Sequence, residues 1–173
     1  MKALRRREAL FAALVVVLVG IMFGRAVMRS RAELETAERY HEEGQLARAT
    51  EHYRRSLRWW FPFSPFRAEA ASRLESLAAA LEEADDRAGA LLAWRSLLGG
   101  VTASRFIYSS ADPVAEHAKD EIARLMVLEG GATIDANLSP EKLAADHRRL
   151  LDREATPHPL WGTVLLLGFA AWI

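Results

Sequence analysis

The sequence predicts an all-α protein in which short helices stack as antiparallel hairpins behind an N-terminal transmembrane helix. Apolar residues between residues 30 and 158 recur at intervals of three and four, which is the helical spacing. No segment shows a sustained alternation of apolar and polar residues, so a half-buried β-sheet is not expected. The third observation is an uncharged apolar stretch near each end of the chain, of the kind that crosses a bilayer.

The N-terminal apolar stretch, residues 9–24, is predicted to be an uncleaved membrane anchor. It gives about 24 Å of helix, and residues 25–28 extend it to the ~20 residues that a bilayer requires, if the charge of Arg25 reaches the interface. A cleaved signal peptide is the alternative, but no small-x-small cleavage site follows the stretch. We assign residues 1–29 to this anchor. A cytoplasmic N-terminus is favoured by the preceding basic residues Lys2, Arg5, Arg6 and Arg7.

Residues 31–58 are predicted to form the first helical hairpin. Residues 31–43 contain neither proline nor glycine, and their apolar residues have helical spacing. Gly44 interrupts this pattern, and residues 46–58 resume it with Tyr53 on the apolar face. One helix is therefore expected on each side of the glycine.

A second hairpin is predicted at residues 65–98. Ser64 followed by Pro65 combines a capping residue with a first-turn proline, which starts a helix that runs to about Glu83. Two aspartates mark the next turn, and a fourth helix begins at Arg87. We expect this helix to end at Leu98, because two glycines follow it and glycine commonly terminates helices.

Two further helices are predicted in the C-terminal third of the chain. Asp112 followed by Pro113 starts a fifth helix, which a glycine pair stops near residue 130. Ser139 followed by Pro140 starts a sixth helix in the same way. These two helices would form a third, poorly matching pair or a cap on the stack.

The C-terminal stretch, residues 160–173, is also uncharged and is predicted to be a second apolar span. Its 14 residues give only ~21 Å of helix, so it is either a short span or a truncated one. A buried terminal helix is the alternative. A span is favoured because the stretch follows a proline-containing linker and shows no polar face. Between the two apolar ends, we assign residues 30–129 to a helical repeat domain and residues 130–159 to an extra helix and the linker.

Composition excludes several functions and indicates a compartment. The 173 residues include no cysteine, which excludes disulfides, thiolate metal sites and thiol catalysis. The formal net charge is zero, which argues against a nucleic-acid partner. Arginine outnumbers lysine 20 to 3, a bias that suggests a GC-rich bacterial genome. Together with the basic N-terminus, this predicts a location in the bacterial inner membrane, with residues 30–158 on the periplasmic side.

Two segments that lie 41 residues apart share one pattern of small and aromatic residues. The pattern resembles the tetratricopeptide repeat over about residues 30–100, with an insertion of about seven residues and an aspartate at the glycine position of the second repeat. The resemblance implies stacked hairpins, in which small residues allow close helix contact and an aromatic side chain fills the gap to the next hairpin. The alternative is a generic bundle of helical hairpins. The matched positions are Ala37, Tyr40, Gly44, Ala49 and Tyr53 in the first segment and Ala78, Leu81, Asp85, Ala90 and Trp94 in the second.

The resemblance also implies that the chain binds a protein in a groove lined by the first helix of each hairpin. A solvated helix face is the alternative interpretation of the polar residues concerned. The expected function is a non-catalytic scaffold or adaptor that recruits another, membrane-associated protein at the lipid bilayer. A structural subunit whose transmembrane helices make the main contacts is the alternative. The candidate groove residues are Glu35, Glu38, Arg39, Glu42, Arg73 and Ser76.

An aromatic insert lies between the two predicted hairpins. We expect its rings to be buried within the fold. Contact with the membrane interface or with a partner protein is the alternative, because an exposed apolar patch usually marks a contact. The five candidate interface aromatics fall within eight positions and are Trp59, Trp60, Phe61, Phe63 and Phe66.

No sequence pattern indicates catalysis. The five histidines include no pair at the i, i+4 spacing of a metal site. The acidic pairs are adjacent in sequence, so their carboxylates do not face each other on a helix. The two glycine pairs lack the lysine of a phosphate-binding loop. We therefore predict no catalytic residues, no cofactor, no metal and no small-molecule substrate, and an enzyme with an unrecognised site is the remaining alternative.

Overall fold

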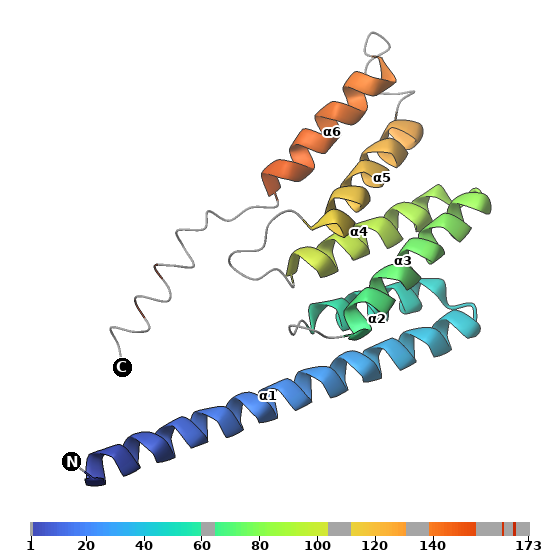
Figure 1. The fold of residues 1–173 in the computed structure, drawn as a ribbon. Coiled ribbons are helices and arrows are strands. Elements are labelled where there is room, and N and C mark those ends of the chain that lie inside the picture. The colour runs from blue at the N-terminus through green and yellow to red at the C-terminus, as the bar shows by residue number, and fades with distance from the viewer. Residues whose placement is uncertain are drawn as a thin grey trace.

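The computed structural model describes residues 2–59, 65–103, 112–130 and 139–154, together with Val164 and Gly168. These residues form helices and no strand, which confirms the predicted all-α class (Figure 1). The predicted second span at residues 160–173 lies outside the described residues, apart from those two positions. In chain order the helices are α1 (Lys2–Glu42), α2 (Leu46–Arg58), α3 (Pro65–Glu83), α4 (Arg87–Ala103), α5 (Pro113–Gly130) and α6 (Pro140–Glu154).

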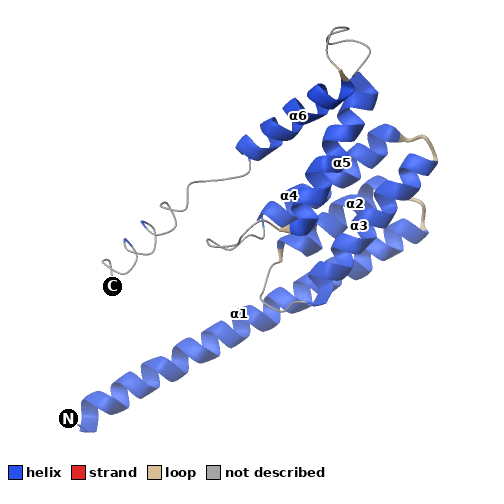
Figure 2. Ribbon diagram, turned by 45° about the horizontal axis from the view of Figure 1, so that its top comes forward, coloured by secondary structure: helices blue, strands red, loops and turns tan. Residues whose placement is uncertain are grey.

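Helix α1 is one continuous helix of 41 residues, about 60 Å long. The predicted anchor and the predicted first helix of the hairpin are thus parts of one helix. No proline interrupts the segment, and its glycines are tolerated within a helix. The N-terminal part of α1 projects beyond the other helices in two views (Figures 1 and 2). Large apolar side chains between Leu10 and Met28 are exposed, and α1 is long and apolar enough to span a membrane.

The turns of the α1–α2 and α3–α4 hairpins have the same backbone geometry. Gly44 and Asp85, which lie 41 residues apart, both have a positive φ, of 72° and 57°. In each turn the next amide donates to the carbonyl five residues earlier, at 2.8 Å in both cases. Glycine adopts the left-handed backbone freely, and aspartate is one of the few other residues that tolerate it. The repeat in the sequence therefore corresponds to a repeated turn.

Small residues lie where the hairpin helices pack together. Ala37 of α1 and Ala49 of α2 are fully buried, as are their counterparts 41 residues later, Ala78 of α3 and Ala90 of α4. Alanine at these positions lets two helix backbones approach more closely than a larger side chain would allow. The buried cluster around them is continuous from α1 to α5, so the two hairpins form one packing unit.

The two aromatic residues of the repeat pattern are buried, as the sequence predicted. Tyr53 of α2 is 1% exposed and Trp94 of α4 is 5% exposed. The Trp94 ring lies edge-on to His117 of α5, with 5.3 Å between the ring centroids. Its Nε1 donates a hydrogen bond to Glu82 Oε1 at 3.3 Å. Trp94 thereby connects the second hairpin with the next helix.

Helix α4 continues past the glycine pair that was expected to end it, so the predicted end at Leu98 is wrong. Gly99 and Gly100 lie inside α4, which ends at Ala103. Gly100 is buried against Leu57 of α2, and a Cβ atom at Gly100 would lie 2.8 Å from Leu57 Cβ. This glycine therefore reflects the close packing of α2 and α4 rather than a helix terminus.

Helices α5 and α6 start at the predicted residues but do not extend the 41-residue repeat. Asp112 Oδ1 accepts a hydrogen bond from Val114 N at 3.1 Å, and α6 begins directly after Ser139. The position 41 residues after Asp85 is Met126, which lies inside α5. Helix α6 packs on α5 at the end of the stack that is farthest from α1 (Figure 1).

Candidate partner-binding groove

Three helices of the two hairpins meet around a cavity of about 320 Å³, which we call the α1–α3 groove. Helix α1 contributes Glu38, His41 and Glu42 to its lining. Helix α2 contributes Tyr53, and α3 contributes Arg73. The first helices of the two hairpins also contact each other directly, so the groove lies on the side that the resemblance assigns to partner binding.

An ion pair joins the two walls of the α1–α3 groove. Arg73 Nη2 lies 3.0 Å from Glu38 Oε1 on the opposite helix and 4.0 Å from Glu69 Oε1 on its own helix. The side chains are partly exposed, so the pair contributes at most about 1 kcal/mol to stability. Its main consequence is geometric, because it fixes where one guanidinium and one carboxylate face the cavity.

Tyr53 supplies the buried aromatic surface of the groove. Its ring lies edge-on to His41, with 6.4 Å between the ring centroids. Burial, and after it the negative charge of Glu38, raises the pKa of the Tyr53 hydroxyl above its ordinary value. The hydroxyl is therefore neutral at physiological pH. It makes no hydrogen bond to any residue that the structure describes, so it is available to a ligand.

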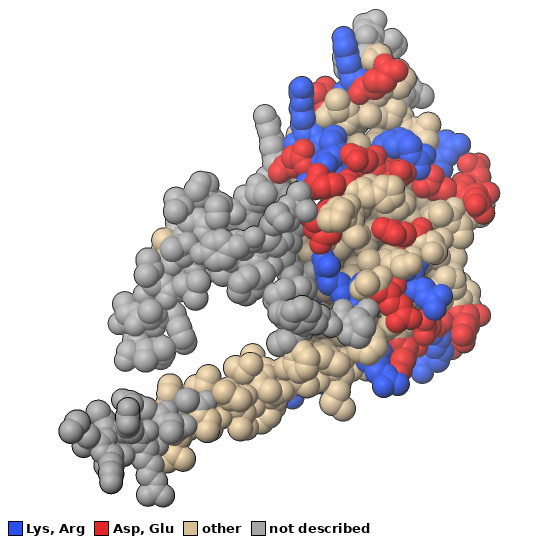
Figure 3. Space-filling model, viewed as in Figure 1, with Lys and Arg blue, Asp and Glu red and all other residues tan. Residues whose placement is uncertain are grey.

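The α1–α3 groove is acidic. Glu38 and Glu42 place two carboxylates in it against the single guanidinium of Arg73. Glu42 is exposed and has no ion-pair partner among the described residues. Elsewhere on the face drawn in Figure 3, acidic and basic side chains are interspersed over the stacked helices, whereas the projecting part of α1 is largely uncharged. A basic group of a partner would therefore find an unpaired acceptor at Glu42.

Three of the six predicted groove residues line the cavity, and the other three do not. Glu35 is exposed and pairs with Arg31 on its own helix, with 2.7 Å between Arg31 Nε and Glu35 Oε1. The guanidinium of Arg39 lies over the ring of Tyr40, 5.6 Å from its centroid. Ser76 is exposed on α3. The structure therefore brings Glu38, Glu42 and Arg73 together around one cavity and places the other three residues outside it.

Two groove residues were not among the predicted ones. His41 lies three residues after Glu38 and is on the same face of α1, so helical spacing alone could have identified it. Tyr53 was assigned a packing role from the repeat pattern. The hydroxyl of a buried tyrosine needs either a hydrogen-bond partner or access to solvent. The sequence could not show that the Tyr53 hydroxyl reaches solvent through this groove.

The aromatic insert is described only at its two ends. Trp60, Phe61 and Phe63 lie outside the described residues. Phe66 is partly buried and packs against the core. Trp59 is 41% exposed. The expectation of burial therefore holds for Phe66 and is wrong for Trp59.

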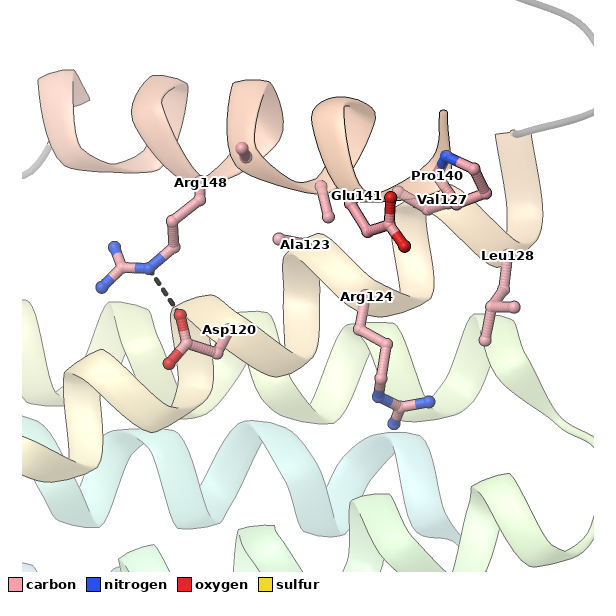
Figure 4. A pocket seen from close by; sticks show the side chains of 10 residues that line it. Asp120, Ala123, Arg124, Val127, Leu128, Pro140, Glu141 and Arg148 are labelled. Atoms are coloured by element: carbon pink, nitrogen blue, oxygen red, sulfur yellow. Dashed lines mark hydrogen bonds and ion pairs between the residues drawn. The ribbon is translucent and has the colours of Figure 1, made fainter. Parts of the chain in front are cut away.

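A larger cavity, of about 480 Å³, lies between α5 and α6 (Figure 4). Its walls are mainly apolar, and Leu128 stands at one end of it. An ion pair between Arg148 Nε and Asp120 Oδ1, 2.7 Å apart, crosses the other end. Arg124 points away toward α3, where it lies 2.6 Å from Glu82. This cavity contains none of the predicted site residues.

The described part of the chain contains no cluster of three His, Asp or Glu residues that could hold a metal ion. Two half-buried histidines contact protein groups: His52 Nδ1 lies 2.7 Å from Glu33 Oε2, and His147 Nδ1 lies 2.8 Å from Leu143 O. Among the described residues, the groups other than Tyr53 with a shifted pKa all belong to ion pairs at the surface. These shifts therefore have a structural explanation.

No protein-family model, curated protein or solved structure that was compared with the chain gives a significant match. The functional interpretation therefore rests on the residues of the chain itself. The relevant features are the repeated turns, the projecting apolar helix and the α1–α3 groove.

Proposed function

We propose that this chain is a membrane-anchored, non-catalytic adaptor of the tetratricopeptide type, which binds a segment of another protein in the α1–α3 groove. The groove itself carries the proposal, because side chains from α1, α2 and α3 converge there on one acidic cavity. The equivalent turns at Gly44 and Asp85 support the stacking of two similar hairpins. An enzyme with an unrecognised site gains no support from a specific observation.

The anchor and the groove share one helix, which sets the position of a bound partner. Helix α1 runs without interruption from its apolar part to Glu42. Glu38 lies 10 residues beyond Met28, the end of the predicted span, and this corresponds to a rise of about 15 Å. A bound segment is therefore held at about this height above the bilayer. This geometry favours a partner that is itself membrane-associated.

The chemistry of the groove favours a partner segment with a basic side chain. A lysine or arginine would make a charge-assisted hydrogen bond to Glu42, while Arg73 stays paired with Glu38. The Tyr53 hydroxyl adds a neutral polar contact at the buried side of the cavity. One such contact gives little affinity, so the segment must also bury surface along α1 and α3.

We place the stacked helices on the periplasmic side of a bacterial inner membrane. Four basic residues precede the anchor, and such residues are retained in the cytoplasm. The chain has no cysteine, so a single Ala47→Cys substitution at an exposed position of α2 tests the orientation. Labelling by a membrane-impermeant maleimide in cells with a permeabilised outer membrane supports it. Labelling only after lysis of the inner membrane contradicts it.

One observation favours the second candidate, a structural subunit whose anchor makes the main contacts. Gly20 and Gly24 lie one turn apart on the exposed apolar part of α1, and no other described part of the chain comes within 4 Å of the position that a Cβ would occupy at either glycine. Small residues at this spacing are common where transmembrane helices pack together. In that case the stacked helices would serve as a spacer.

Affinity purification from native membranes separates the two candidates. The wild type is compared with Glu42→Gln and with Glu83→Gln. Glu83 is a matched control because it lies 41 residues after Glu42, is also exposed and is not part of the groove lining. The adaptor predicts about tenfold weaker partner binding for Glu42→Gln, as expected for the loss of one charge-assisted hydrogen bond, and no change for Glu83→Gln. Recovery of the same partners by a chain that lacks residues 30–158 would contradict the adaptor.

A further inference from the structure

A second polar cavity lies at the C-terminal end of α2. Its volume is about 420 Å³, and it is lined by Glu33 of α1 and by Arg55, Arg58 and Trp59. We call it the juxtamembrane cavity. Trp59 is 41% exposed, a large exposure for a side chain that is usually mostly buried. The α1–α3 groove does not include any of these residues.

The pairing of α1 with α2 sets the height of the juxtamembrane cavity. The two helices run antiparallel: His52 contacts Glu33, with 2.7 Å between Nδ1 and Oε2. One turn further along α2, Ser56 Oγ donates to Ser30 O at 2.9 Å. Trp59 lies three residues beyond Ser56, so the same antiparallel pairing places it level with residues 26 and 27 of α1. The end of α2 therefore points back toward the apolar part of α1.

This height coincides with the edge of a bilayer that α1 spans. With residues 25–28 included, the span of α1 ends near Met28, so the end of α2, which is level with residues 26 and 27, lies at the edge of the hydrocarbon core. The polar headgroup layer is roughly 5–8 Å thick on each side of the hydrocarbon core. Arg58 and Trp59 consequently lie at the inner edge of the headgroup layer, where tryptophan side chains are enriched in membrane proteins. Glu33, the other end of the cavity lining, is about 8 Å beyond Met28, at the outer edge of this layer.

Arginine side chains at this level lack acidic partners. Arg25, Arg29 and Arg58 make no ion pair with any residue in the described ranges, and all three are exposed. Arg29 lies one turn before Glu33 and on the same face of α1. The carboxylate of Glu33 is already engaged by His52. The cavity and its surroundings therefore present an excess of positive charge beside an exposed indole.

We propose that the juxtamembrane cavity binds the phosphate of an anionic phospholipid, with Arg58 and Arg29 as its cationic partners and Trp59 beside the glycerol region. A guanidinium matches a phosphate through two parallel hydrogen bonds. A bound headgroup fixes the rotation of α1 in the membrane, and with it the direction in which the α1–α3 groove faces. The proposal rests on the proposed function only in requiring that α1 spans a bilayer, and it is independent of any partner protein.

The position of the cavity favours a lipid over a soluble phosphate compound. It lies at the height where phospholipid phosphates are concentrated, and its apolar indole suits the boundary between headgroups and acyl chains. A free phosphate or a phosphorylated peptide would use the arginines but not the exposed ring. Binding of the lipid and binding of the free anion must therefore be measured separately.

Native mass spectrometry of the full-length chain in detergent micelles measures lipid retention directly. Phosphatidylglycerol, phosphatidylethanolamine and inorganic phosphate are added in separate experiments. The variant is Arg58→Gln, and the matched control is Arg95→Gln, an exposed arginine of α4 that makes no ion pair with a described residue. We expect the wild type and the control to retain phosphatidylglycerol in preference to phosphatidylethanolamine. Arg58→Gln should retain about fivefold less, and the double variant with Arg29→Gln about 25-fold less.

Equal retention of phosphatidylglycerol by the wild type and by Arg58→Gln would overturn the proposal, as would full displacement of the lipid by inorganic phosphate. Alkaline carbonate washing of native membranes separates this result from a failure of the anchor. Release of the wild-type chain contradicts both this proposal and the anchored adaptor. Retention of the chain in the membrane with unchanged lipid binding in the variant contradicts the lipid site alone. The affinity of the Glu42→Gln variant for a partner protein tests only the proposed adaptor function, and not the lipid site.

Discussion

The contact between the two hairpins and the contact between α5 and α6 are made by different interactions. Helices α2 and α4 pack through buried apolar and small residues, with Gly100 against Leu57. Helix α6 is attached to α5 by charged groups: Lys119, only 4% exposed, lies 3.0 Å from Glu116 Oε1 and 2.7 Å from Asp152 Oδ1. A mainly apolar cavity remains between α5 and α6. The hairpins thus depend on shape, whereas the position of α6 depends on charge.

This difference has a consequence for stability along the stack. Apolar packing changes little with salt, whereas partly exposed ion pairs are weakened by it. Arg148 of α6 extends the network through further pairs with Glu116, Asp120 and Asp152. We therefore expect a stable unit formed by α1 to α4 and a more readily detached α6.

The largest effect is expected from removal of Trp94. The Trp94→Ala substitution deletes a buried ring that contacts His117 and removes the donor to Glu82. It should lower the free energy of unfolding by about 3–5 kcal/mol. Leu92→Ala, at a half-exposed position of the same helix, should change it by less than about 0.5 kcal/mol. Urea unfolding of the full chain in detergent micelles, followed by circular dichroism, measures both. Equal effects of the two variants would contradict the proposed shape dependence.

The two adjacent glycines of α4 provide a sharper test of the same packing. Gly100→Ala should destabilise the chain by about 1–3 kcal/mol, because the new Cβ collides with Leu57. Gly99→Ala should stabilise it by about 0.5–1 kcal/mol, because Gly99 is helical and nothing lies near its Cβ position. The midpoint of thermal unfolding should therefore move in opposite directions. A shift in the same direction for both would show that α2 and α4 do not approach as closely as described.

Salt should affect α6 more than the hairpins. At molar salt, amide hydrogen exchange in α6 should become faster, while exchange in α2 and α4 stays the same. Asp152→Asn should have the same effect at low salt, because it removes a partner of Lys119. Asp146→Asn is the matched control, since Asp146 pairs only with Arg149 of its own helix among the described residues. Unchanged exchange in α6 under all these conditions would contradict the charge dependence.

Acid should have a smaller effect of the same kind. Lys119, assisted by Arg148, lowers the pKa of Asp152 and of Glu116. A carboxyl group whose pKa is lowered by folding contributes stability that is complete at neutral pH. This contribution is lost as the pH falls below about 4 and through the lower folded-state values. Pepsin, which is active in acid, should therefore cleave first within α6. Earlier cleavage within α2 or α4 would contradict this order.

Local sequence signals predicted most helix termini but not the contacts between helices. Helix α2 occupies the predicted residues 46–58, and α5 starts at its predicted capping aspartate. The end of α4 was misplaced because Gly100 is required by the neighbouring α2, which is not adjacent to it in sequence. The anchor and the first helix of the hairpin join into one helix because no residue between them stops a helix. Helix termini are determined by residues nearby in sequence, whereas the close packing of one helix against another depends on the whole fold.

The candidate groove was predictable to the extent that one helix face determines it. Glu38, Glu42 and Arg73 followed from the repeat pattern, which places the first helices of both hairpins side by side. Tyr53 was missed because it belongs to α2 and reaches the groove only where three helices meet. The juxtamembrane cavity could not be anticipated for a related reason, since its height depends on the register between α1 and α2.

Photo-cross-linking in native membranes tests the adaptor most directly. A photoreactive amino acid is placed at position 42 in one variant and at the equivalent position 83 in another, and the products are identified by mass spectrometry. The account predicts a defined protein partner cross-linked from position 42, through a segment that contains a basic residue, and no such product from position 83. The same products from both positions, or a partner cross-linked only from the apolar part of α1, would contradict binding in the α1–α3 groove.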